Sequence, residues 1–80
     1  MTYEVDTLLL KSKIVLKGYN TVTFSAKIGI SRNTLSGILN GKKPTYTIMD
    51  TIINELNLEN EEAANVFFKK KLTHYERNKN

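Results

Sequence analysis

The chain has 80 residues, a net charge of +4 and 40% hydrophobic residues, which suits one small globular domain and not a disordered segment. It has no cysteine, which excludes disulfides and thiolate metal sites. No apolar run approaches a membrane span and no signal segment opens the chain, so we expect a cytoplasmic protein without a membrane partner.

Charges are distributed unevenly along the chain. Thr7 to Met49 contains no acidic residue but seven basic ones, whereas Asp50 to Glu62 contains five acidic residues and no basic one. Because misplaced carboxylates would repel phosphates, the long acid-free stretch favours a surface that binds an anionic polymer. The alternative is chance in a chain rich in lysine and asparagine, so the charge pattern does not decide the matter alone.

The first predicted helix covers about residues 7–17. Leu10 and Ile14 stand four residues apart, which places them on one face of a helix. Gly18 follows and is suited to the left-handed conformation that ends a helix.

The second predicted helix has a complete start signal. Asn20 is a favourable N-cap residue, and Tyr19 and Phe24 occupy the two positions of a hydrophobic staple around it. Phe24 and Ile28 then form one apolar stripe. Gly29 is expected to end this helix at once.

The third predicted helix begins with the same kind of signal. Ser31 is the expected N-cap, and the apolar positions Leu35, Ile38 and Leu39 give the helix a buried face. Gly41 closes the segment.

Two further helices follow Pro44. Thr47 to Leu56 shows apolar residues at helical spacing, with Thr45 or Thr47 as the cap. Glu59 to Val66 begins with acidic residues, which stabilise the positive end of a helix dipole. From Phe67 onward the chain either continues as a helix or becomes an extended arm.

These elements predict an all-α fold, a compact five-helix bundle, and they leave an extended C-terminal tail open as an alternative. We assign residues 1–68 to one domain and residues 69–80 to a basic tail.

The most informative stretch is the pair of short helices between Thr21 and Asn40. The three-residue link Gly29-Ile30-Ser31 forces them to cross steeply, and the small Ser25 allows a close approach. The outward residues of the second helix are hydrogen-bonding or small, as a helix in the major groove requires. They are Arg32, Asn33, Ser36, Gly37 and Asn40.

The run from Phe24 to Lys42 resembles the helix-turn-helix of the phage repressor and Cro-like (XRE-type) family. The resemblance implies a repressor-like fold and a transcriptional regulator that binds a double-stranded DNA operator as a homodimer and acts by promoter occlusion in a bacterial host, in association with the nucleoid. The short chain is similar to small phage Cro-type regulators. Thr21 and Ser25 depart from the Gln and Ala that the family often has.

Roles for individual residues follow from these positions. The expected base-reading residues are Arg32 on guanine, Asn33 on adenine, Ser36 and Gly37. The expected phosphate-binding residues are Thr21, Asn40, Lys42, Lys43 and Thr47. Arg32 is otherwise a solvated charge, and residues 40–43 are otherwise an ordinary polar turn. Gly37 indicates that either DNA or a neighbouring helix approaches closely.

Other features point away from catalysis. His74 has no second metal-ligating partner, and the glutamates from Glu59 to Glu62 suit a helix start better than a catalytic pair. We therefore expect no enzyme activity, no cofactor, no metal and no small-molecule substrate.

Phe67 and Phe68 either complete the core or form the contact between two copies of the chain. Two alternative functions stay open. One is the antitoxin of a toxin–antitoxin pair, with a toxin-binding surface in the tail from Phe67. The other is a protein-interaction module on the same fold.

Overall fold

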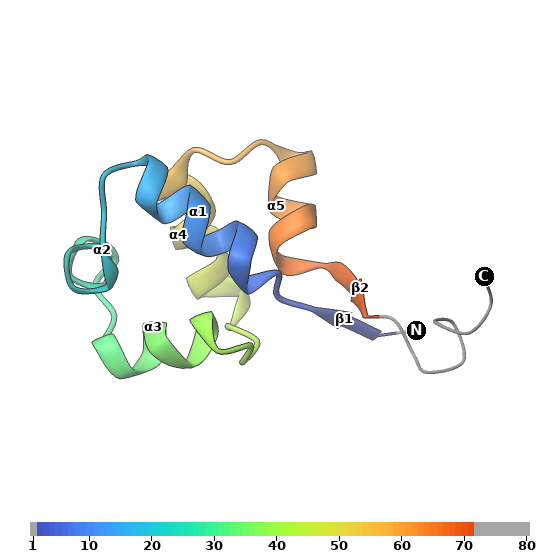
Figure 1. Cartoon of the computed structure of the whole chain (residues 1–80), viewed down its shortest axis with the longest axis horizontal. Helices are drawn as coiled ribbons and strands as arrows, with labels where there is room; N and C mark the ends of the chain where they lie inside the picture. The colour runs from blue at the N-terminus through green and yellow to red at the C-terminus, as the bar shows by residue number, and fades with distance from the viewer. Residues whose placement is uncertain (1, 72–80) are drawn as a thin grey trace.

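The structure, a computed structural model, describes residues 2–71, which fold into five helices and one two-stranded ribbon (Figure 1). The predicted helical class and all five predicted helices are confirmed. None of the helices in this part of the chain is long and apolar enough to cross a membrane. The elements in chain order are β1 (Thr2–Glu4), α1 (Thr7–Leu16), α2 (Thr21–Ile28), α3 (Arg32–Leu39), α4 (Tyr46–Leu56), α5 (Asn60–Phe67) and β2 (Lys69–Lys71).

Side-chain caps fix the starts of the central helices. The side chain of Asn20 accepts a hydrogen bond from the Thr23 N–H at 2.8 Å, and Ser31 Oγ accepts one from the Thr34 N–H at 3.1 Å. Both predicted N-caps are therefore confirmed. Of the two threonines proposed for α4, Thr45 is the cap, because its Oγ1 accepts from the Ile48 N–H at 3.3 Å.

The core lies between the five helices, and every helix contributes to it. The predicted staple is present, with the rings of Tyr19 and Phe24 5.3 Å apart. Ile28 and Ile30 are partly buried against the core. The fully buried apolar side chains include Leu10, Phe24, Leu35, Ile38, Ile52, Val66 and Phe67.

The ribbon joins the two ends of the described chain. β1 and β2 pair antiparallel, with Thr2 opposite Lys71 and Glu4 opposite Lys69. A strand at residues 2–4 was not expected, and of the two alternatives after Phe67 the extended one is observed from Lys69. Next to the ribbon, a further backbone hydrogen bond joins the same two parts of the chain: the Asp6 N–H donates to the Val66 carbonyl at 2.7 Å.

Phe67 and Phe68 have different environments. Phe67 is 1% exposed and belongs to the core. Phe68 is 44% exposed and packs its ring edge-on against Tyr3, with ring centroids 6.1 Å apart. Of the two alternatives for this pair, Phe67 completes the core, and only Phe68 presents a surface. Residues 72–80, which include His74 and most of the expected basic tail, lie outside the described residues.

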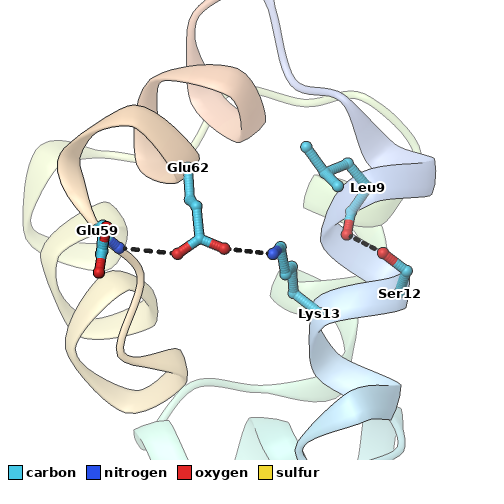
Figure 2. Close-up of polar contacts among 5 residues, drawn as sticks. All are labelled: Leu9, Ser12, Lys13, Glu59 and Glu62. Atoms are coloured by element: carbon cyan, nitrogen blue, oxygen red, sulfur yellow. Dashed lines mark hydrogen bonds and ion pairs between the residues drawn. The ribbon is translucent and has the colours of Figure 1, made fainter.

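Glu62 connects the start of α5 to α1 (Figure 2). One carboxylate oxygen accepts from the Glu59 N–H at 3.1 Å in a capping box, and the other accepts from the Lys13 ammonium. The Lys13 contact, followed by the Glu59 N–H, lowers the pKa of Glu62 from its usual 4.5. The helix-start role expected for Glu62 is confirmed, and the same side chain also forms an ion pair between helices.

Candidate nucleic-acid interface

The interface begins with the crossing of α2 and α3. Figure 1 shows α2 almost end-on while α3 runs across the view, so the two helices cross steeply as predicted. Gly29 makes the turn in a left-handed conformation (φ +74°), and the Ile30 N–H then donates to the Ser25 carbonyl at 3.0 Å. Ser25 is buried and donates its hydroxyl to the Val22 carbonyl, which allows close packing without an unpaired polar group.

α3 buries one face and exposes the other. Leu35, Ile38 and Leu39 lie in the core. On the opposite face, the structure of residues 2–71 gives no hydrogen bond or ion pair to the side chains of four exposed residues. These are the predicted Arg32, Asn33, Ser36 and Asn40; Gly37 stands among them, half-buried. The helix therefore presents a polar face without acidic groups.

The loop after α3 folds back onto that helix. The backbone N–H groups of Asn40 and Lys42 both donate to the Gly37 carbonyl, at 3.1 and 2.9 Å. Lys42 and Lys43 are exposed, and the structure of residues 2–71 gives them no ion pair. Two ammonium groups thus stand directly beside the exposed face of α3.

A hollow of about 220 Å³ brings four of the predicted residues together. Asn33 and Gly37 contribute from α3, and Lys42 and Lys43 from the loop. Arg32 is exposed at the first position of α3 and does not line this hollow.

The two predicted threonines lie apart from this hollow. Thr21 is half-buried at the first position of α2 and lines a separate hollow with Leu39. Thr47 is exposed in the first turn of α4. Since Thr45 caps α4, the cap does not use the hydroxyl of Thr47.

Some of the basic residues serve the fold. Lys13 is ion-paired with Glu62 on the side of α1 that faces α5, and Lys17 is near enough to lower the pKa of Glu62 further. The acid-free stretch therefore overstates the basic charge at α3. In residues 2–71, no group of three or more His, Cys, Asp or Glu side chains is arranged to hold a metal ion.

A second surface includes Phe67 and Phe68, the pair that the sequence offered as a contact between two copies, together with residues that were not predicted. Tyr3, Tyr46, Met49 and Phe68 line an apolar hollow of about 390 Å³, and Lys43 stands at its edge. Tyr46 is 76% exposed at the first position of α4, outside the apolar stripe of that helix. The exposed position of Tyr46 outside the apolar stripe was a sequence signal for this surface. The contribution of Tyr3 depends on the ribbon, for which the sequence held no signal.

Comparison with known proteins agrees with this geometry. A family model described as helix-turn-helix matches residues 10–62, which is more than half of the chain. The chain belongs to the helix-turn-helix family. It is a DNA-binding domain of the kind that regulates transcription, and the predicted motif from Phe24 to Lys42 lies inside the matched range. Neither the curated proteins nor the solved structures contain a significant match to this helix-turn-helix protein.

Proposed function

We propose that this helix-turn-helix protein is a Cro- or repressor-type regulator that binds a specific double-stranded DNA site and represses by promoter occlusion in the bacterial cytoplasm. The observation that carries the proposal is the exposed face of α3. Its polar side chains have no hydrogen-bonding partner within residues 2–71, and two unpaired lysines adjoin it. Such a face supplies base-edge contacts and phosphate contacts together.

Base reading and phosphate binding are assigned to different residues. Arg32 reads guanine and Asn33 reads adenine from the N-terminal half of α3, while Ser36 and Gly37 face neighbouring base edges. Asn40, Lys42 and Lys43 bind the phosphate backbone beyond the end of α3. Thr21 and Thr47, at the first turns of α2 and α4, bind phosphates on either side.

We also propose that the protein binds a pseudo-palindromic operator as a homodimer, with the second copy on the aromatic hollow around Phe68. Tyr46 and Phe68 are 76% and 44% exposed there, and clustered exposed aromatics are typical of protein contacts. The hollow shares Lys43 with the interface loop, so a second copy bound there lies next to the DNA-binding surface. Phe67 also lines the hollow but is only 1% exposed, so Phe68 supplies most of the contact surface of the pair.

The decisive experiment is selection of bound sequences from a random duplex pool, followed by binding to the selected site at several salt concentrations. We expect one enriched, pseudo-palindromic sequence and a steep salt dependence, with a slope of about −0.9 per neutralised phosphate. The proposal would be wrong if no sequence were enriched, or if the affinity of the complex did not change with salt concentration. Footprinting of polymerase on a promoter that contains the site then tests occlusion.

A further inference from the structure

Gly37 occupies a position in α3 where the backbone does not require glycine. It is an interior residue of the helix Arg32–Leu39, and its φ is not among the positive values found at Gly18, Gly29 and Gly41. Glycine is among the weakest helix formers, so alanine would favour α3 at this position.

Packing inside the chain does not require glycine either. A Cβ atom at Gly37 would meet only the side chain of Lys42, with Cδ at 3.7 Å and Cβ at 4.0 Å. Both are ordinary van der Waals distances. Of the two alternatives raised by the sequence, a neighbouring helix that needs the space is therefore excluded, and an approach from outside the chain is left.

The space beside Gly37 has an apolar base and a polar edge. Ile38, which is 2% exposed, and the partly buried Ile48 line the hollow of about 220 Å³ together with Gly37. The other lining side chains are exposed and polar: they are Asn33, Thr34, Lys42, Lys43 and Thr45.

We propose that this hollow receives the 5-methyl group of a thymine in the operator, and that Gly37 determines specificity by leaving room for it. The inference rests on the proposed function and names the base that this part of the site selects. The thymine methyl is the apolar group that base edges present in the major groove, and it matches the isoleucine base of the hollow. Asn33, one helical turn before Gly37, is positioned for adenine, so the two residues together select A·T pairs. A phosphate oxygen would suit the lysines at the edge but not the apolar base.

The first test removes the methyl group alone. Each thymine of the selected duplex is replaced in turn by deoxyuridine, which keeps every hydrogen-bonding group of the base. Since burying one methyl group is equivalent to about a fourfold change in affinity, we expect about fourfold weaker binding at one position in each half-site. Full affinity of the wild-type protein for every deoxyuridine duplex overturns the proposal.

The second test fills the hollow with Gly37→Ala. We expect the melting temperature to rise by about 3–6 °C from the better helix propensity. Affinity for the thymine duplex should fall about tenfold, toward the wild-type affinity for the scrambled site, and the thymine and deoxyuridine duplexes should then bind alike. Asn65→Ala, an exposed substitution in α5, is the matched control: it also improves helix propensity but should leave DNA binding unchanged.

The outcomes separate this inference from the function on which it rests. If no duplex is selected at all, the proposed function fails. If a duplex is selected but Gly37→Ala keeps the full preference for thymine over deoxyuridine, only the assignment of the hollow fails. Equal loss by Gly37→Ala on selected and scrambled duplexes would also overturn it, because a phosphate would then occupy the hollow.

Discussion

The α2–α3 pair and the ribbon end of the molecule expose side chains of opposite chemistry. The first presents Arg32 and Asn33 on an acid-free face, and the second presents Tyr46 and Phe68 around an apolar hollow. The two surfaces meet at Lys43, which lines both the aromatic hollow around Phe68 and the hollow beside Gly37. The comparison indicates that contacts with DNA and contacts with a second copy are carried by separate residues, so substitutions should be able to affect one without the other.

The largest expected effect lies at the ribbon end, between two adjacent phenylalanines. Phe67→Ala should cost about 3–5 kcal/mol of the free energy of unfolding, because it leaves a cavity in the core of a small domain. Phe68→Ala should cost about 1 kcal/mol or less and should instead weaken dimerisation. Urea denaturation and sedimentation of both variants check this. Equal destabilisation by the two would mean that Phe68 is also part of the core.

At the α3 end, the contrast is between a residue proposed to read a base, Arg32, and one proposed to bind the phosphate backbone, Lys42. Arg32→Ala should reduce discrimination between selected and scrambled duplexes by about 1–3 kcal/mol, because it removes a bidentate contact to guanine. Lys42→Ala should weaken both duplexes alike and lower the salt slope by about one. Binding titrations at several salt concentrations measure both. If Arg32→Ala loses the same factor on the two duplexes, Arg32 is a phosphate anchor, and base reading passes to Asn33 and Ser36.

The start of α3 depends on a single side chain. Ser31→Ala should cost about 1 kcal/mol of the free energy of unfolding, since the Thr34 N–H loses its acceptor. Ser12→Ala is the matched control, because Ser12 is an exposed serine inside α1 that bonds only back to the Leu9 carbonyl (Figure 2). Thermal unfolding compares them. A control that destabilises as much as Ser31→Ala would show that the cap has no special role.

The smallest expected effect concerns pH and the link between α1 and α5. The folded-state pKa of Glu62 is lowered from 4.5, so its stabilising contribution is present above about pH 4.5 and is lost as the pH falls through the folded value. Glu62→Gln should therefore lose less stability than the wild type when the pH is lowered, because glutamine has no charge to lose. Glu61→Gln, an exposed change in the same turn, serves as control. Melting temperatures between pH 3 and pH 7 should converge for wild type and Glu62→Gln at the acid end; parallel curves would contradict the assignment.

The helices could be predicted because their signals are local. Caps such as Asn20 and Ser31, the glycine at residue 29 and the apolar spacing within α4 all act within one or two turns of chain. The exposed face of α3 followed directly from its helical periodicity. By contrast, periodicity could not predict that Arg32 lies outside the hollow beside Gly37. The hollow depends on how the loop folds back onto the helix.

The ribbon could not be predicted because its signal is non-local. Thr2 and Tyr3 favour a strand, but a three-residue segment is too short to be recognised alone, and the three lysines of β2 are poor strand formers. The two segments also pair across nearly the whole described chain. The different environments of Phe67 and Phe68 depend on that pairing, since α5 ends between them and Phe68 then turns toward Tyr3. The contribution of Tyr3 to the aromatic hollow was missed for this reason, although Phe67 and Phe68 were named as a candidate contact.

The ribbon also has a topological consequence. With residue 2 paired to residue 71, the two ends of the described segment lie side by side. In a protein made of residues 2–71, a short linker could join these two positions, and the exposed turn at Asn57, between α4 and α5, offers a site to open the chain. A circular permutant made in this way would begin with α5 and end with α4. It would keep the whole segment from Asn20 to Leu56 continuous, so we expect it to retain the surface proposed to meet DNA.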